Sequence, residues 1–320
     1  MTVAAGAAPI ANVVRNGVVE SVHHGHVAVL SASGRVVAAL GDPDAVVFPR
    51  SSLKPVQAVA MLRCGLDLDG ELLALASASH SGEAIHVAGA RAILAGAGLD
   101  ETALQNTPDY PLDDEAALAW RSAGGAKASV VQNCSGKHAA MLATCVAAGW
   151  DTTTYRAPDH PLQKAVTDTI AELTGDDVTH VAVDGCGAPL FSCTVAGLAR
   201  AFGRLAAAGA SGDASPEGRV GRAISAHPEY VGGTGRDVTR LIAGVPGLVA
   251  KDGAEGVYAA GLPDGSAAAL KVLDGSQRPR PVVMAAALRR LGVGDVVLDE
   301  VGSVPVLGHG EPVGAVEPLL

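Results

Sequence analysis

A serine and a lysine three residues apart, Ser51 and Lys54, are the first residues in the chain whose types and spacing suggest chemistry. A serine hydroxyl is a weak nucleophile at neutral pH and needs a nearby base to accept its proton. A neutral lysine can be that base, whereas arginine keeps its proton in a protein. On a helix, a spacing of three places both side chains on one face. The pair therefore predicts an activated serine, and a helix-capping serine beside a surface lysine fits the same pattern.

Two later segments could extend this chemistry. Ser79 and Ser81 lie in a polar stretch that is interpreted either as a helix cap or as a second polar group facing Lys54. Lys251 and Gly253 enter a late strand and match two positions of the Lys-Thr-Gly strand of penicillin-recognising enzymes, without the threonine. Ser-x-x-Lys is the nucleophile signature of the same enzymes, so the order of the segments favours a serine hydrolase.

Two cysteines, together with a lysine or a histidine, could bind a metal. Cys134 is followed by Lys137 and His138, and Cys186 lies much later in the chain. Thiolates with either the amine of Lys137 or the imidazole of His138 could hold Zn²⁺, although the pattern lacks a Cys-x₂-Cys pair, and buried cysteines also serve as small apolar residues. The chain has five cysteines without paired spacing, which predicts reduced thiols and a cytoplasmic protein.

The elements that must position these residues change along the chain. Short β-rich runs separated by turns fill residues 13–40, helical periodicity dominates the middle, and strand patterns return at 247–273 and 297–306. This order predicts a mixed α/β (α+β) fold with an antiparallel sheet built from both termini, flanked by helices. We expect one catalytic domain, with a sheet lobe at about 1–60 and 230–320 and an inserted helical lobe at about 61–229. The pattern lacks the alternation of a Rossmann domain, so nucleotide binding is not predicted.

Composition excludes several functional classes. The formal charge is −10, from 33 acidic and 23 basic residues, which argues against a nucleic-acid partner. Hydrophobic residues make up 48% of the chain, enough for a large core. No apolar run reaches the roughly 20 residues of a membrane span, and residues 1–11 lack the basic start of a signal peptide. A soluble cytoplasmic protein with no membrane partner is therefore expected.

Five segments, in one order, resemble the asparaginase II family of zinc-containing asparaginases. The segments that carry this resemblance are residues 50–55, 78–83, 133–138, 184–189 and 251–256. The resemblance implies a serine β-lactamase-like fold and the hydrolysis of L-asparagine to L-aspartate and ammonia. It also implies two serine–lysine tandems, Ser51 with Lys54 and Ser79 with Lys251.

The same resemblance implies the remaining site residues. Zn²⁺ would be held by Cys134, Lys137 and Cys186. Six residues of these segments are expected to contact the substrate: Arg50, His80, Glu83, Asn133, Gly253 and Ala254. The Ala-rich helical part of the chain would suit a homodimer.

In our hypothesis Ser51 attacks the amide carbon while Lys54 takes its proton, and Ser79 with Lys251 relays protons or orients the substrate. Which serine becomes acylated is left open by the sequence. Three alternatives remain beside an asparaginase: a glutaminase, a β-lactamase-like serine hydrolase, and a non-catalytic module that binds zinc or an amino acid. Discrimination against glutamine rests on one methylene, worth about 1–3 kcal/mol.

Overall fold

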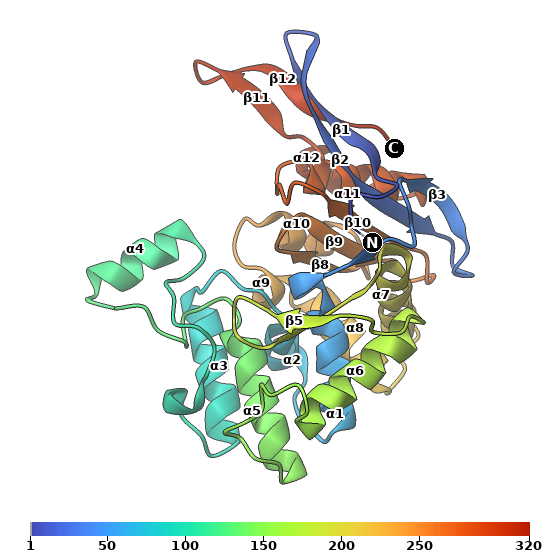
Figure 1. Cartoon of the computed structure of the whole chain (residues 1–320). Helices are drawn as coiled ribbons and strands as arrows, with labels where there is room; N and C mark the ends of the chain where they lie inside the picture. Colours follow the sequence, from blue (N-terminus) through green and yellow to red (C-terminus); the bar gives the residue numbers. More distant parts are fainter. Residues whose placement is uncertain (1) are drawn as a thin grey trace.

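One antiparallel sheet joins the two ends of the chain in the computed structural model, which describes residues 2–320 (Figure 1). Its strands run in the order β11-β12-β1-β2-β10-β9-β8, and β3 also pairs with β2. The strands of this sheet are β1 (Ala8–Arg15), β2 (Val18–Leu30), β3 (Val36–Leu40), β8 (Val249–Gly253), β9 (Val257–Gly261), β10 (Ala267–Val272), β11 (Pro305–Gly308) and β12 (Glu311–Pro318). The mixed α/β fold with a sheet from both termini is therefore confirmed.

Helices occupy most of the chain between β3 and β8. They are α1 (Lys54–Arg63), α2 (Gly70–Ala76), α3 (Ala84–Gly96), α4 (Asp114–Ser122), α5 (Ser135–Ala148), α6 (Pro161–Thr174), α7 (Val195–Ala210), α8 (Pro216–Ala226), α9 (Pro228–Val231) and α10 (Asp237–Gly244). Two more, α11 (Arg280–Arg290) and α12 (Val297–Val301), follow β10, and the 3₁₀ turns are η1 (Arg50–Leu53) and η2 (Glu101–Ala103). Short strand pairs join β4 (Val46–Val47) to β7 (Cys193–Thr194) and β5 (Val181–Val183) to β6 (Pro189–Phe191).

The strands nearest the predicted site are covered on both faces. Every residue of β8, β9 and β10 is buried. Helix α7 packs on β9 and β10, and α11 packs on the same two strands. Strands buried on both faces read as nearly continuous apolar runs, as Val257–Gly261 does, whereas Ala267–Val272 is interrupted by Lys271. A charged side chain in these strands therefore needs a partner inside the protein.

Helix α1 is the centre of the helical region. Its residues from Lys54 to Leu62 are all buried, and it packs against α5, α6 and α8. Pro55 lies in the first turn, where its missing N–H costs no intrahelical hydrogen bond, as predicted. The 3₁₀ turn η1 leads directly into α1, so Ser51 and Lys54 lie on one continuous helical path.

Two local predictions are wrong. Residues 297–306 were expected to form a strand, but Val297–Val301 is helix α12, and strand structure begins only at Pro305. Helix α3 is capped by Glu83 rather than by a serine of the preceding loop.

Within residues 2–320, no helix combines the length and the apolar character that a bilayer crossing requires.

Candidate active site

The turn that carries Ser51 packs against the edge strand of the sheet. Strand β8 is last in the strand order, and η1 contacts it directly. The hydroxyl of Ser52 donates a hydrogen bond of 3.1 Å to the carbonyl oxygen of Lys251. The turn begins at Arg50, whose backbone φ of +55° is one that residues other than glycine rarely adopt. Tertiary contacts hold this strained backbone in place and fix the position of Ser51.

Lys54 is buried, and its amine points between two segments of the site. Only 1% of the residue is exposed. Its Nζ donates to the carbonyl oxygen of Ala78 at 2.6 Å and contacts the Sγ of Cys134 at 3.1 Å. The predicted base therefore lies inside the protein, next to the loop that carries Ser79.

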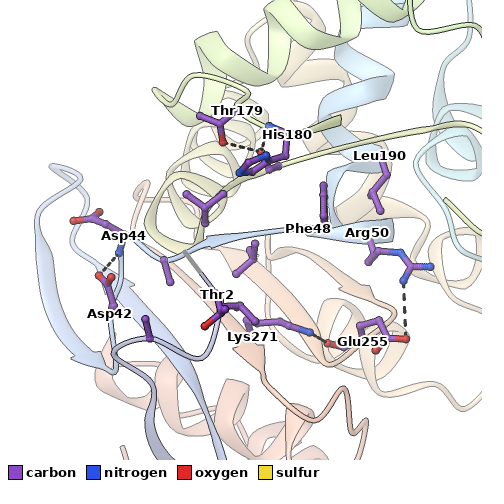
Figure 2. A pocket seen from close by; sticks show the side chains of 16 residues that line it. Thr2, Asp42, Asp44, Phe48, Arg50, Thr179, His180, Leu190, Glu255 and Lys271 are labelled. Atoms are coloured by element: carbon purple, nitrogen blue, oxygen red, sulfur yellow. Dashed lines mark hydrogen bonds and ion pairs between the residues drawn. The ribbon is translucent and has the colours of Figure 1, made fainter. Parts of the chain in front are cut away.

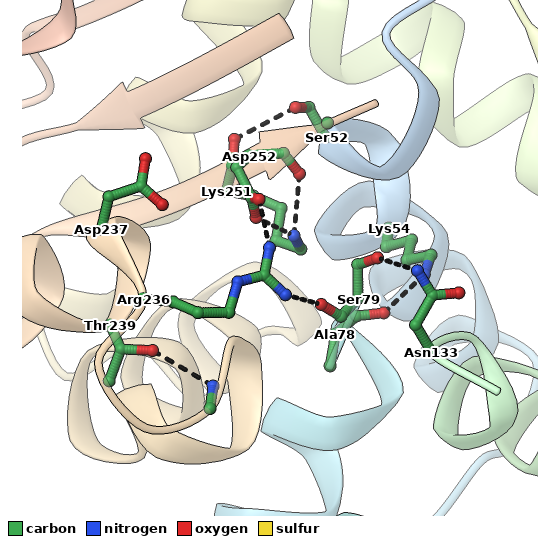
Figure 3. A network of polar contacts seen from close by, with 12 residues as sticks. Ser52, Lys54, Ala78, Ser79, Asn133, Arg236, Asp237, Thr239, Lys251 and Asp252 are labelled. Carbon is green, nitrogen blue, oxygen red and sulfur yellow. Dashed lines mark hydrogen bonds and ion pairs between the residues drawn. The ribbon is translucent and has the colours of Figure 1, made fainter. Parts of the chain in front are cut away.

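Ser79 has a defined partner for its hydroxyl oxygen. Asn133 donates from Nδ2 to Ser79 Oγ at 3.2 Å (Figure 3), while its own Oδ1 accepts from Gln132 at 2.7 Å. The hydroxyl proton of Ser79 is thus free to be donated to a base. This contact places the predicted substrate residue Asn133 beside a predicted catalytic serine.

Lys251 is fully buried in β8 beside a carboxylate. Its Nζ donates to the backbone oxygen of Asp252 at 2.8 Å and also contacts Oδ1 of that residue. Burial, opposed by Asp252 and aided by the nearby charges of Arg236 and Lys54, lowers the pKa of Lys251 to about 8. Lys251 therefore gives up its proton more readily than an ordinary lysine, at a pH of about 8.

Three cations surround Asp252, and two of them, Arg236 and Arg280, were not predicted from the sequence. Arg236 and Arg280 both contact Oδ2 of Asp252, Arg280 at 3.4 Å. Burial alone would raise the pKa of Asp252, but Lys251 and the two arginines outweigh it and hold the pKa well below its usual range. One signal was available in the sequence: a Lys-Asp pair inside an otherwise apolar strand requires partner cations from elsewhere.

The serines and lysines lie in one region without direct bonds between them. Among residues 2–320, no hydrogen bond joins the hydroxyl of Ser51 or Ser79 to the amine of Lys54 or Lys251. In Figure 3, Lys54 lies next to Ser79, and Lys251 lies to the upper left of both, beside Asp252. The site can therefore perform proton transfer only after a side-chain rotation or once a substrate is bound, and such contacts often tighten only in the substrate complex.

Two of the predicted substrate residues are engaged in contacts that fix loops. Both ring nitrogens of His80 are paired, with Ser135 Oγ at 3.0 Å and with the backbone N–H of Gly82 at 3.1 Å. Burial, then neighbouring positive charge, lowers the pKa of His80 well below its usual value. Glu83 accepts hydrogen bonds from the backbone and the hydroxyl of Thr234. His80 thus braces the start of α5, and Glu83 fixes the loop before α10.

Arg50 and Ala254 lie toward the outside of the site. The Arg50 guanidinium pairs with Asp184 at 2.8 Å, and its Nη1 lies 4.0 Å from Glu255. Ala254 is exposed in the turn between β8 and β9. Neither residue has a hydrogen bond or ion pair to the amine of Lys54 or Lys251 within residues 2–320.

Gly253 permits the close contact between η1 and β8. A Cβ atom at this position would lie 2.6 Å from the carbonyl oxygen of Pro49 and 2.9 Å from Ser52 Oγ. We expect Gly253→Ala to push the turn away from the strand, which lowers the free energy of unfolding by about 1–3 kcal/mol and reduces turnover. Thermal unfolding and steady-state kinetics measure both effects. Gly294→Ala is the matched control, because a Cβ there meets no atom within 4 Å; equal behaviour of the two variants would contradict the prediction.

The predicted metal ligands form a buried group of their own. Cys134 and Cys186 lie together with Ala188, and Lys137 Nζ is 3.2 Å from Cys186 Sγ. A hydrogen bond from Cys186, and then the charges of Lys54 and Lys137, lower the pKa of Cys134 well below its usual value against the opposing effect of burial. Within residues 2–320, no three His, Cys, Asp or Glu side chains cluster at a possible metal site. Any metal here would therefore depend on Lys137 as a ligand.

A large cavity lies next to this region, and Figure 2 shows its lining. Its volume is about 720 Å³, and Arg50, Glu255, Lys271, Phe48 and His180 are among its walls. Arg50 is the only predicted site residue that lines it; the predicted serines and lysines do not. The cavity therefore adjoins the candidate site on the side of Arg50 and does not contain the predicted chemistry.

Comparison with known proteins identifies the family. Residues 11–318 match the family model described as L-asparaginase II, so this chain belongs to the L-asparaginase II family, and the predicted resemblance is confirmed. No curated protein matches the chain.

Several solved structures are similar at low identity. Mglu in its native form is 15% identical with a TM-score of 0.46; the match covers 84% of this chain and 65% of that one, just under two thirds of its length. A beta-lactamase from Mycobacterium bovis is 14% identical with a TM-score of 0.47, and covers 84% and 95% of the two chains. EstCE1, a hydrolase with promiscuous acyltransferase activity, is 12% identical with a TM-score of 0.43, and covers 82% and 93%. Similarity of this degree does not bear on the reaction.

Proposed function

We propose that the protein is an L-asparaginase that hydrolyses L-asparagine to L-aspartate and ammonia through serine hydroxyls activated by lysine amines. The observation that supports it most is the burial of two lysines, Lys54 and Lys251, in the region that also holds Ser51 and Ser79. Burying an amine is unfavourable unless it is paired or neutral. Two buried lysine amines near serine hydroxyls are better suited to accepting protons than to stabilising the fold.

In this mechanism Ser51 attacks the side-chain amide carbon, and Lys54 accepts the hydroxyl proton. For that step the Lys54 amine turns from Ala78 and Cys134 toward the start of the same helix. The proton then passes to the departing nitrogen, ammonia leaves, and water hydrolyses the aspartyl ester. Lys251, whose pKa is about 8, serves with Ser79 as the second proton-transfer pair.

Ammonia release from L-asparagine by the purified wild-type enzyme tests this function. We expect asparagine to be preferred over glutamine by roughly 10- to 200-fold in kcat/KM, the range that one methylene allows. Turnover of a chromogenic β-lactam without ammonia release from either amide would instead favour a β-lactamase-like hydrolase. Ligand binding without any turnover would favour the non-catalytic module.

The proposal includes a zinc ion held by Cys134, Cys186 and Lys137. The donors fit: two adjacent thiols, one with a strongly lowered pKa, and an amine 3.2 Å from the other. The ring of His138 is buried beside Cys186, and its Nδ1 is hydrogen-bonded to the Tyr155 hydroxyl at 2.6 Å. Burial lowers the pKa of Lys137, but Cys186 and Cys134 raise it more, so a bound metal would have to displace a proton from this amine. When bound, zinc would supply positive charge near the substrate, and Cys134 would no longer be available as a partner for Lys54.

The metal has a direct test that does not need activity. We expect about one zinc per chain by elemental analysis of the wild-type protein, because two thiolates and an amine provide soft ligands. Cys134→Ser should lose most of this metal. Cys145→Ser is the control, since Cys145 is also buried but lies outside the thiol pair. Retention of full zinc by Cys134→Ser would contradict the assignment.

Two further parts of the proposal concern the whole protein. The free cysteines, Cys64 among them, suit a reducing cytoplasm. We also propose a homodimer, as expected from the Ala-rich helical region. Size-exclusion chromatography with light scattering determines the oligomeric state.

A further inference from the structure

Five charged side chains meet where β8 approaches the start of α10. Asp252 contacts Lys251, Arg236 and Arg280, and Asp237 pairs with Arg280 at 3.3 Å. Three cations thus face two carboxylates when Lys251 carries its proton. Buried charge without a counter-charge is unfavourable. The cluster therefore carries one net positive charge below about pH 8, which favours the binding of one further anion there, and it is balanced once Lys251 is neutral.

Arg236 is the cation of this cluster that can reach an anionic ligand. Its side chain is 20% exposed, whereas Arg280 is 7% exposed and Lys251 is fully buried; of the two carboxylates, Asp252 is 5% and Asp237 22% exposed. Its Nη1 donates to the carbonyl oxygen of Ser79 at 2.6 Å, and its Nη2 contacts Asp252 (Figure 3). A guanidinium has five N–H donors, so these two bonds leave others free. The free donors lie directly beside a predicted catalytic serine.

The loop that carries Arg236 is held in place from the opposite side. Glu83, at the N-terminus of α3, accepts from Thr234 N at 2.7 Å and from Thr234 Oγ1 at 2.9 Å. On the side of β8, the carboxylate of Asp252 holds Nη2 of the Arg236 guanidinium. Donors that are oriented before binding lose less entropy when a planar carboxylate arrives.

We propose that Arg236 binds the α-carboxylate of the substrate, so that the enzyme acts on free amino-acid amides and rejects those that lack this carboxylate or carry it blocked in a peptide bond. The inference rests on the proposed amidohydrolase reaction and names the group that recognises the rest of the substrate. A guanidinium and a carboxylate form paired charge-assisted hydrogen bonds, and the incoming anion balances the surplus positive charge. Arg236 touches the substrate away from the reacting carbon, so its role is in specificity.

The test compares L-asparagine with 3-aminopropanamide, which is asparagine with hydrogen in place of the α-carboxylate. For the wild-type enzyme we expect kcat/KM for asparagine to exceed that for 3-aminopropanamide by at least 10- to 100-fold, the effect of hydrogen bonds to a charged group. In Arg236→Gln this ratio should collapse through a higher KM for asparagine, with little change for 3-aminopropanamide. Arg236→Lys should restore part of the ratio.

Arg240→Gln is the matched control, because Arg240 lies one turn further along α10 and pairs with Glu300 at the surface. Equal ratios in the wild-type and Arg236→Gln enzymes would overturn the proposal. Measuring the binding of L-aspartate and of β-alanine by calorimetry tests the carboxylate site independently of hydrolysis. If no amide is hydrolysed, the proposed function fails, while aspartate binding that Arg236→Gln abolishes still supports the carboxylate site. Aspartate binding that is absent, or unchanged in the variant, overturns it.

Discussion

Ser51→Ala is expected to reduce kcat for L-asparagine by roughly 10⁴-fold or more, the scale of loss seen when a serine nucleophile is removed. Ser51 is almost fully buried in the strained turn beside β8, and the methyl group of alanine fits the same space. The loss should therefore appear in kcat with little change in thermal stability. Steady-state kinetics and thermal unfolding of the same preparation measure both.

Ser52→Ala provides the comparison within the same turn. Ser52 is also buried, but its hydroxyl donates to the backbone of Lys251 and has no assigned role in the chemistry. Removing that hydrogen bond should cost about 1 kcal/mol of stability and change turnover far less than Ser51→Ala. If Ser51→Ala keeps near-full turnover, the assignment of Ser51 fails. Trapping an aspartyl ester on Ser79 would then transfer the nucleophile to that residue.

The order of elements could be predicted because each depends on local patterns. Turn residues separate the first strands, and helical periodicity begins after the turn at Ser51. The local pattern was misleading at 297–306, where valine-rich sequence favoured a strand. In the structure Leu298 and Val301 are buried on one side of helix α12, which packs against α10 and α11. Tertiary packing therefore outweighed β propensity in that segment.

The site was predictable at the level of segments and less so at the level of contacts. Spacing placed Ser51 and Lys54 on one helical path, which the structure has. Spacing could not show that the Lys54 amine reaches Ala78 and Cys134, because those partners come from distant parts of the chain. Arg236 was missed for the same reason: it follows a glycine-rich loop with no local pattern, and its role arises only from its contact with Asp252.

The activity of the wild-type enzyme is expected to rise with pH and to level off above about pH 8. Burial and neighbouring cations disfavour the ammonium form of Lys251 and lower its pKa to about 8. Below that pH the amine holds its proton and cannot accept another; above it the amine is neutral and can act as a base. This rising limb of the pH profile should appear in kcat/KM, because kcat/KM reports the ionisation of groups in the free enzyme. A profile of kcat/KM against pH, at constant ionic strength, measures it.

Lys251→Arg should remove the rising limb together with most of the activity. An arginine at this position keeps its positive charge and its pairing with Asp252, but it does not release a proton at any pH that the protein tolerates. We expect a loss of about 10²- to 10⁴-fold, the usual contribution of a general base. Lys164→Arg makes the same substitution at an exposed lysine of α6 and should leave both rate and profile unchanged. If Lys251→Arg retains a rising limb near pH 8, another group is responsible for it, and Lys251 serves only to hold the charge of Asp252.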